Sequence, residues 1–277
     1  MQEVRCKLLG TPISHSLSPD IHRCFAQQHG ILVDYEPAET RLDELRQCLW
    51  DLHQEGIQGV NLTVPLKERA IEYCRSISPR ARACGAVNVL KAEPDGWHGD
   101  NTDGSGFWRD LTVRHDFRDR QASILVIGAG GAARGIVGQL LAESLDVVLA
   151  VRRLEQGVRL VGELGNHYPS SPAVYDLKAL PQDQPFQLII NATSAGLMGQ
   201  LPALESRLFA SHPWVYDISY GSTARAFLSW AMRQGASRVT DGLGMLIEQA
   251  AEAFTLWTGR SCETDPVYDW FRSHYPV

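Results

Sequence analysis

The sequence lacks several features that would assign a chain of this size to a particular class of protein. No apolar run approaches the ~20 residues needed to span a bilayer. The six cysteines form no C-x-x-C pair and the nine histidines show no H-E-x-x-H spacing, so we expect neither a metal site nor a thioredoxin-like motif. The formal net charge is −6, which leaves no overall basic surface for nucleic acid.

No signal-peptide core is expected at the N-terminus, because charged residues occur within the first seven positions. We therefore expect a cytoplasmic protein whose cysteines are reduced thiols. The 277 residues favour about two domains of ~100–200 residues each. A composition of 44% hydrophobic and 21% charged residues is ordinary for a soluble globular protein.

Short apolar runs alternate with helical patterns along the chain, which is typical of an α/β protein with mainly parallel sheets. Strands are expected over residues 4–9, 33–37, 59–64, 123–127, 147–151, 188–191 and 214–218. Residues 86–92 are followed by Pro94-Asp95-Gly96, a turn sequence that favours a hairpin.

Three helices are marked by their caps or their periodicity. Ser18 resembles an N-cap with Pro19 at the first helical position, and Gly30 ends that helix. A second helix ends at Gly56, and residues 246–257 are apolar nearly all round, as in a buried helix. One face of the second helix carries Leu42, Leu45, Leu49 and Leu52. We expect a first domain over 1–103 that is completed by 242–277, and a second domain over 104–241.

A glycine-rich loop follows the strand expected at 123–127 and opens a helical pattern. It matches G-x-G-x-x-G/A with Gly128, Gly130 and Ala133. Gly128 permits the tight turn, Gly130 lets the backbone approach a pyrophosphate, and Ala133 lets the helix pack on the sheet. The N-terminus of that helix offers N–H groups to phosphates. The context favours a Rossmann-type dinucleotide site over a plain glycine turn.

The residues after the next strand favour NADP over NAD. An NAD site usually carries Asp or Glu about 20 residues past the loop, where this chain has Val151-Arg152-Arg153. A guanidinium cannot accept a hydrogen bond from the ribose 2′-hydroxyl but suits a 2′-phosphate. The alternative is that both arginines are solvated surface charges, and Glu155 leaves NAD open.

Three polar segments are unusual for a scaffold. In Ser14-His15-Ser16-Leu17-Ser18-Pro19, hydroxyls lie beside a helix N-terminus, where a carboxylate binds well, although capping alone would explain one serine. Asn61 and Thr63 share one side of a strand, and Lys67 follows its carboxyl end. Asn88 precedes the run Asn101-Thr102-Asp103-Gly104, which alone could be a turn and a helix cap.

The combination of these segments points to a reversible alcohol–ketone oxidation. Such a reaction needs a proton carrier near the reacting oxygen. A lone lysine is usually a solvated surface group, but a buried lysine beside an aspartate can carry the proton. Lys67 and Asp103 are therefore the candidate catalytic pair.

The sequence resembles the shikimate dehydrogenase family along nearly its whole length. Seven segments in the same order carry the resemblance: Pro12 to Pro19, Asn61 to Lys67, Gly85 to Asn88, Asp100 to Gly104, Gly128 to Arg134, Asn191 to Ser194 and Asp241 to Leu246. The resemblance implies a substrate domain, a Rossmann-type NADP domain and C-terminal helices that return to the first domain. It also implies reversible reduction of 3-dehydroshikimate to shikimate in aromatic amino acid (chorismate) biosynthesis, with no nucleic-acid or membrane partner and a monomeric or homodimeric state.

Roles for individual residues are also implied by the resemblance. Lys67 and Asp103 are the catalytic pair. Ser16 and Ser18 hold the substrate carboxylate, and the other expected substrate contacts are Thr63, Asn88, Tyr220 and Gln249. The expected cofactor contacts are Gly128, Ala129, Gly130, Gly131, Ala132, Arg152, Arg153, Thr193, Ile218 and Gly242. Gln249 stands out independently, because an amide in an apolar helix needs partners, although a core hydrogen bond would also satisfy it.

Two departures from the family pattern keep alternatives open. Val151-Arg152-Arg153 replaces the usual Asn-Arg-Thr or Asn-Arg-Ser, and a double arginine also occurs in related quinate/shikimate dehydrogenases, where Asp follows instead of Leu154. Ile218 replaces the usual Met or Val near the nicotinamide. The alternatives are a quinate/shikimate dehydrogenase, a dehydrogenase for an amino-substituted ring, and a non-catalytic NADP-binding sensor, which would not need Lys67 and Asp103 together.

Overall fold

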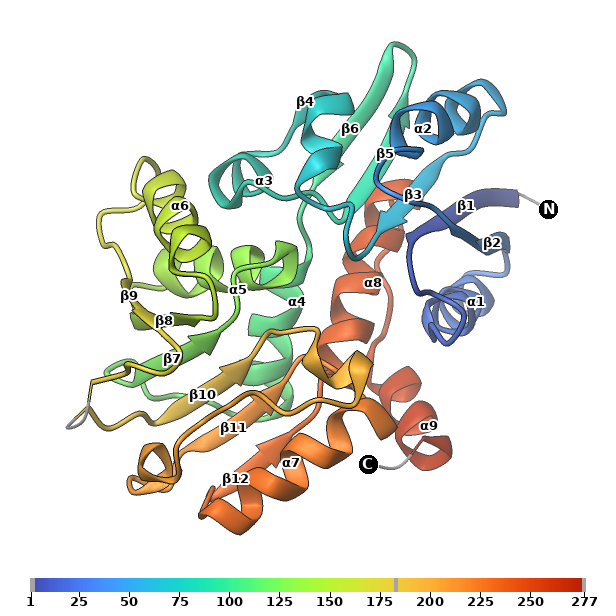
Figure 1. Cartoon of the computed structure of the whole chain (residues 1–277). Helices are drawn as coiled ribbons and strands as arrows, with labels where there is room; N and C mark the ends of the chain where they lie inside the picture. The colour runs from blue at the N-terminus through green and yellow to red at the C-terminus, as the bar shows by residue number, and fades with distance from the viewer. Residues whose placement is uncertain (1–2, 182–183, 276–277) are drawn as a thin grey trace.

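The computed structural model describes residues 3–181 and 184–275, which form two six-stranded sheets joined by long helices (Figure 1). The strand orders are β2-β1-β3-β5-β6-β4 and β12-β11-β10-β7-β8-β9. The predicted α/β class with a Rossmann-type second sheet is confirmed. No helix in the described ranges is long and apolar enough to cross a membrane.

The first sheet is mixed. β1 lies parallel to both β2 and β3, whereas β5 and β6 form the predicted hairpin and β5 runs antiparallel to β3. Its strands are β1 (Glu3–Gly10), β2 (Leu32–Glu39), β3 (Gly59–Leu62), β4 (Cys74–Ile77), β5 (Val89–Glu93) and β6 (Gly96–Asp100). Its helices are α1 (Ser18–Gln28), α2 (Leu45–Gln54) and α3 (Pro79–Cys84), with a 3-10 turn at Arg69–Tyr73.

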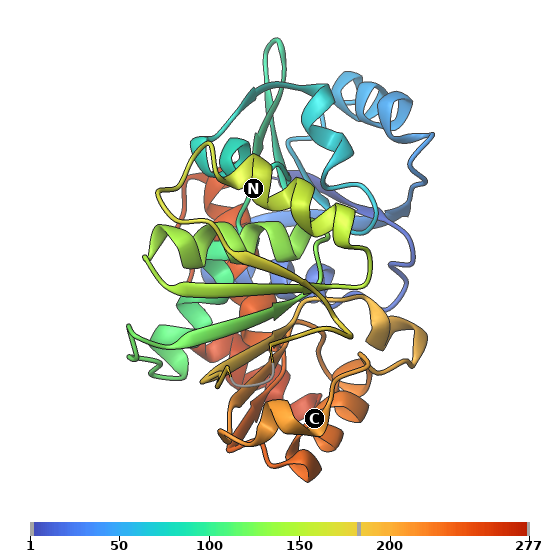
Figure 2. The same cartoon turned by 60° about the vertical axis from the view of Figure 1, so that its left-hand side comes forward.

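The second sheet is entirely parallel, with the carboxyl ends of its strands at one edge. Its strands are β7 (Ser123–Ile127), β8 (Asp146–Val151), β9 (Ala173–Asp176), β10 (Leu188–Asn191), β11 (Trp214–Asp217) and β12 (Arg238–Thr240). The helices α5 (Gly131–Ala142) and α6 (Leu154–Leu164) cover one face and α7 (Ser222–Gln234) covers the other (Figure 2). Short 3-10 turns occupy Ala195–Met198 and Ser206–Phe209.

Some local predictions were wrong. Ser18 is the first residue of α1 and makes no cap hydrogen bond, because Leu17 occupies the N-cap position. Leu42 lies three residues before α2 and its side chain is 46% exposed, so only the three later leucines face the core. β3 ends at Leu62 instead of Val64.

Among the elements that the sequence analysis did not specify are β4, α3, α6, α7, β9 and β12. The start of α3 carried a usable signal, because the Ser78 hydroxyl accepts a hydrogen bond from the Ala81 N–H and Pro79 follows at the first helical turn. The three strands have only three or four residues each and lie at or next to sheet edges. Such short segments carry little periodicity.

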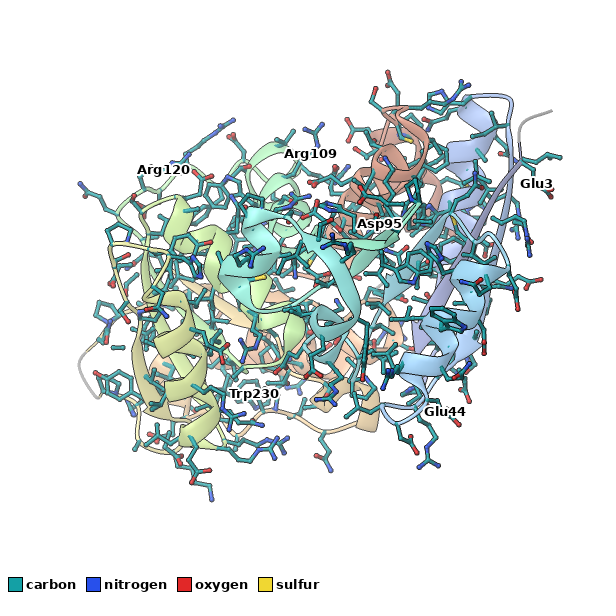
Figure 3. All side chains as sticks on the ribbon, turned by 90° about the horizontal axis from the view of Figure 1, so that it is seen from above. Glu3, Glu44, Asp95, Arg109, Arg120 and Trp230 are labelled. Carbon is teal, nitrogen blue, oxygen red and sulfur yellow. The ribbon has the colours of Figure 1, made fainter. Side chains whose placement is uncertain are left out.

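The two sheets are connected through α4 (Asp103–Arg109), its π-helical extension Asp110–Arg114, and α8 (Leu243–Thr258), while α9 (Asp265–His274) closes the chain. α4 packs tightly against α5 and α8 through glycines. A Cβ on Gly104 would lie 2.3 Å from the Gly135 carbonyl oxygen, and one on Gly106 would lie 2.7 Å from the Gln249 nitrogen. Arg109 at the end of α4, which is labelled in Figure 3, forms an ion pair with Glu248 of α8, with 2.8 Å between Nε and Oε2.

Gly244→Ala should lower the free energy of unfolding by about 2–4 kcal/mol. The added Cβ would lie 1.8 Å from Asp110 Oδ1, and that fully buried carboxylate accepts hydrogen bonds from Tyr216 at 2.7 Å and Arg114 at 3.0 Å. The added methyl group therefore displaces the buried Asp110 carboxylate from its hydrogen-bond donors. Urea denaturation measures the change, and Gly162→Ala is the matched control, because nothing lies within 4 Å of its Cβ. Equal stability of the two variants would contradict this explanation.

Candidate active site

Lys67 and Asp103 form a buried ion pair between the two halves of the molecule. Lys67 Nζ lies 2.6 Å from Asp103 Oδ2, and the two side chains are 13% and 5% exposed. Lys67 lies five residues beyond β3 and Asp103 is the first residue of α4. The two residues that the sequence analysis selected as catalytic are thus in direct contact. Such a contact is required if the carboxylate is to influence proton transfer by the lysine.

Asn88 holds the other oxygen of the aspartate. Its Nδ2 lies 2.9 Å from Asp103 Oδ1, 3.0 Å from Thr102 Oγ1 and 3.3 Å from Gln249 Oε1. The N–H of Thr102 donates to Asn88 Oδ1 at 2.8 Å, which fixes the orientation of the amide. Lys67, Asn88, Asp103 and Gln249 therefore form one cluster from four separate segments. Thr102 belongs to this cluster but was not selected from the sequence.

The serine pair forms a second polar cluster at the start of α1. Ser16 Oγ donates to Ser18 Oγ at 3.1 Å and accepts from the Ser18 N–H at 3.2 Å. Tyr220 lies in the loop after β11 and is half-buried. Burial raises the pKa of the Tyr220 hydroxyl, and hydrogen bonds with the Leu17 backbone and the Ser16 side chain act in the opposite direction. Tyr220 is therefore under the electrostatic influence of Ser16, and its role in a shared substrate cleft stays a prediction.

Asn61 and Thr63 do not form the shared polar face that strand periodicity predicted. β3 ends between them, and Asn61 is 5% exposed with both ends of its amide bonded inside the protein. Tyr35 donates to Asn61 Oδ1 at 2.9 Å, and Asn61 Nδ2 donates to the Asn88 carbonyl at 3.3 Å. Thr63 is half-buried in the turn that leads to Lys67, and its N–H donates to the Leu9 carbonyl at 2.9 Å.

The glycine loop, residues 128–132, joins β7 to α5 as predicted. Gly128 has φ +113°, which favours glycine, and a Cβ there would lie 2.9 Å from the Ala192 carbonyl oxygen. A Cβ on Gly130 would meet nothing within 4 Å, whereas one on Gly131 would lie 2.7 Å from Lys67 Cβ. The first turn of α5 therefore opens to space beside Lys67, a geometry that suits a phosphate group.

Arg152 and Arg153 follow β8 directly and both side chains are exposed. Within the described part of the chain, neither guanidinium has a hydrogen-bond or ion-pair partner. Glu155 is also exposed, in the first turn of α6. The two arginines could therefore meet an anionic group at the carboxyl end of β8, where a Rossmann-type fold places the adenosine ribose.

The remaining predicted cofactor residues lie at the carboxyl ends of the neighbouring strands. Thr193 Oγ1 donates to Asn191 Oδ1 at 2.8 Å, just after β10. A Cβ on Gly242 would lie 2.1 Å from the Ile218 carbonyl oxygen, so these two residues are in close contact. Burial raises the pKa of Asp217 to about 6, although the Ser219 N–H and the Asn191 amide donate to it. The sequence analysis missed Asp217.

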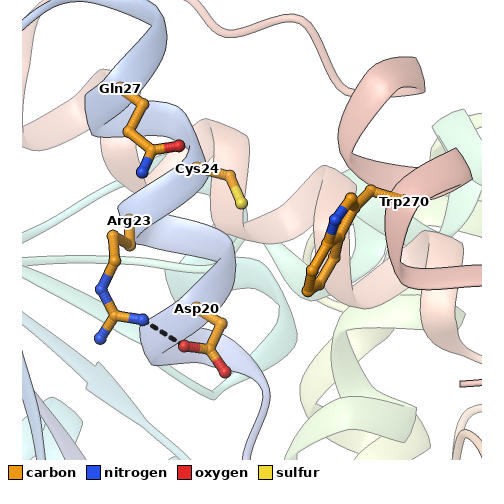
Figure 4. A pocket seen from close by; sticks show the side chains of 5 residues that line it. All are labelled: Asp20, Arg23, Cys24, Gln27 and Trp270. Carbon is orange, nitrogen blue, oxygen red and sulfur yellow. Dashed lines mark hydrogen bonds and ion pairs between the residues drawn. The ribbon is translucent and has the colours of Figure 1, made fainter. Parts of the chain in front are cut away.

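A groove of about 310 Å³ lies apart from these clusters, between α1 and α9 (Figure 4). Its walls carry Asp20, Arg23, Cys24, Gln27 and Trp270. Arg23 pairs with Asp20 across one turn of α1, and the Trp270 ring faces α1 from the opposite wall. None of the residues predicted to bind substrate or cofactor lines this groove.

Comparisons with known proteins agree with the site. Residues 8–90 match the model of the shikimate dehydrogenase substrate binding domain, and residues 242–269 match that of the shikimate 5′-dehydrogenase C-terminal domain. A shikimate dehydrogenase (NADP(+)) from Alcanivorax borkumensis is 43% identical over 263 residues, which cover 94% of this chain and 93% of the relative.

Two solved structures show the same fold over nearly their whole length. An Ael1 enzyme from Pseudomonas putida is 36% identical with a TM-score of 0.85, covering 96% of this chain and 97% of that one. Shikimate 5-dehydrogenase from Thermus thermophilus, in complex with NADP(H) and shikimate, is 31% identical with a TM-score of 0.83, covering 98% and 99%. The chain belongs to the shikimate dehydrogenase family.

Proposed function

We propose that this protein is an NADP-dependent shikimate dehydrogenase that reversibly reduces 3-dehydroshikimate to shikimate. The observation that carries the proposal is the Lys67–Asp103 ion pair, which lies against the glycine loop through the contact of Lys67 with Gly131. This arrangement places a proton carrier beside a dinucleotide site, as a carbonyl reduction requires.

The residues of the second domain fit NADP. The open space at Gly130, the start of α5 at Gly131 and the unpaired guanidinium groups of Arg152 and Arg153 supply donors and positive charge for its phosphates. When bound, the nicotinamide supplies the hydride chemistry. The protein has to orient the ring acid, exclude water and move one proton.

In the direction of reduction, Lys67 donates a proton from Nζ to the ketone oxygen while that oxygen gains negative charge. Asp103 accepts a hydrogen bond from Lys67 at 2.6 Å and keeps the ammonium group oriented. Asn88 donates a hydrogen bond to the second carboxylate oxygen of Asp103 and fixes its position. The free lone pairs of that carboxylate can then accept a hydrogen bond from the ring hydroxyl. In the reverse direction, neutral Lys67 accepts the proton of the alcohol.

The substrate is held by the two polar clusters together. Ser16 and Ser18 bind its carboxylate at the start of α1, with Tyr220 closing the cleft from the second domain. Thr63, Asn88 and Gln249 bond the ring hydroxyl groups. The substrate domain then comprises 1–103 and 242–277, with the NADP domain over 104–241, in a cytoplasmic monomer or homodimer.

The test is the absorbance of reduced nicotinamide with purified protein and every pairing of shikimate or quinate with NADP or NAD. We expect rapid reduction of NADP with shikimate and little with the other three pairings. The exposed double arginine gives one reason to keep the quinate/shikimate dehydrogenase as the second candidate, and turnover of quinate or of NAD would favour it. No reduction in any pairing, with NADP binding intact, would reject a dehydrogenase and leave a nucleotide-binding sensor.

A further inference from the structure

The first turn of α5 packs directly against the proposed catalytic pair. A Cβ on Gly131 would lie 2.7 Å from Lys67 Cβ. A Cβ on Gly135, one turn later, would lie 3.2 Å from Asp103 Cβ. Arg134 follows Gly131 by three positions and therefore lies on the same face of the helix. This face of α5, which begins at the glycine loop, thus carries one long charged side chain between the contacts with the two members of the pair.

The Arg134 side chain is 5% exposed and connects the two halves of the molecule. Its Nη1 donates to the carbonyl of Cys84, at the end of α3, at 3.3 Å and forms an ion pair with Glu163 of α6. Its Nε lies 3.5 Å from Glu68 Oε2 and has no hydrogen-bond partner among the described residues. A buried donor without a partner is costly, so the Glu68 carboxylate is placed where a small approach satisfies it.

The contact with Glu68 reaches the backbone of Lys67, because Glu68 is the next residue in the chain. The same backbone is held from a second direction, since the Val87 N–H donates to the Lys67 carbonyl at 2.8 Å. Val87 lies two residues after Gly85, and a Cβ on Gly85 would lie 2.9 Å from Arg134 Nη1. Arg134 therefore borders both of the segments that fix the position of the lysine.

We infer that Arg134 is a positioning residue for the proton transfer: by pairing with Glu68 it fixes the Lys67 backbone against the start of α5 and so sets the place of the lysine relative to the dinucleotide site. The inference rests on the proposed function, because Lys67 is taken to carry the proton. Proton transfer requires Nζ within hydrogen-bond distance of the ketone oxygen, so a small displacement of this backbone lowers the rate of the chemical step.

The experiment compares Glu68→Ala with wild-type enzyme in initial-rate measurements. We expect kcat with shikimate to fall about five- to tenfold, because a 1 Å misplacement of reacting groups costs up to about 100-fold. The KM for shikimate and the dissociation constant of NADPH should stay within about twofold, since the serine pair and the glycine loop are unchanged. Glu72→Ala is the matched control: its carboxylate pairs with Arg69 in the same segment, and its side chain is 52% exposed, against 50% for Glu68. This control should keep its kcat.

A double-mutant cycle tests whether the effect passes through Arg134. Arg134→Met removes the charge and should lower kcat about tenfold. In that background Glu68→Ala should lower kcat by less than about a further twofold, because its partner is already missing. Glu163→Ala removes another carboxylate from the same guanidinium but leaves the Glu68 contact, so the melting temperature should fall while kcat stays within about twofold.

Three results would overturn the inference. They are an unchanged kcat in Glu68→Ala, an equal loss in Glu72→Ala, and an effect of Glu68→Ala that is fully retained in the Arg134→Met background. Should Arg134→Met fail to fold, the comparison of Glu68→Ala with Glu72→Ala still decides, because both changes alter half-exposed side chains. A wild-type protein without shikimate turnover would instead reject the proposed function, and this inference with it.

Discussion

Lys67→Ala should lower kcat with shikimate by about 100- to 10,000-fold, the range expected when a general acid–base group is removed. The affinity for NADP should stay within about twofold, because the alanine keeps the Cβ that packs against Gly131 of the cofactor loop. Loss of Nζ removes the only cation within hydrogen-bond distance of Asp103 in the described part of the chain, so neither proton donation nor orientation by the carboxylate survives.

The two quantities require separate measurements. The kcat comes from the absorbance assay at saturating shikimate, and the dissociation constant of NADPH comes from a fluorescence titration without substrate. Lys178→Ala is the control, since this lysine is exposed after β9 and lies far from the pair in the chain. Lys67→Gln, which keeps a donor at this position, checks that a loss of activity does not arise from an unpaired buried Asp103. Equal losses of turnover and NADPH affinity would contradict the catalytic role.

The two residues of the proposed catalytic pair could be selected from the sequence because each follows a recognisable pattern. Lys67 lies past the carboxyl end of a short apolar strand, and Asp103 lies at the switch between two blocks of elements. The contact between them did not follow from spacing, because 36 residues separate the two. It depends on α4 leaving the first sheet beside β6, which is a property of the tertiary fold.

The predictions that were wrong concern positions where tertiary contacts override local sequence preferences. Ser18 has the sequence signature of an N-cap, yet its hydroxyl accepts a hydrogen bond from Ser16, and the helix begins one residue earlier than a serine cap requires. Asn61 was expected to share one side of a strand with Thr63, but the strand ends at Leu62 and the alternation of faces stops there. Thr102 and Asp217 were missed because their hydrogen bonds are made to Asn88 and Asn191, which are distant in the sequence.

The pair Arg152→Ala and Arg153→Ala, combined in one variant, should raise the KM for NADP by about 100-fold or more. Each charge-assisted hydrogen bond to a phosphate is worth about 1.5–3 kcal/mol, and about 1.4 kcal/mol is a tenfold change. Both side chains are exposed and lie at the carboxyl end of β8, so their loss removes no buried contact and the fold should be unaffected. The KM for NAD should change less than about threefold, because NAD lacks the 2′-phosphate.

The measurement is kcat/KM for both cofactors at two salt concentrations. An exposed arginine–phosphate contact is screened by salt, so the preference of the wild-type enzyme for NADP should weaken as ionic strength rises, whereas that of the double variant should not. Arg159→Ala provides the control, since this arginine is also exposed but lies in the second turn of α6, beyond the loop after β8. If the double variant kept its preference for NADP, the 2′-phosphate would have to be bound by other residues, and the double arginine would be surface charge alone. If NAD became the better cofactor, Arg152 and Arg153 would account for the whole selectivity, with Glu155 left as the nearest acceptor for the ribose hydroxyl.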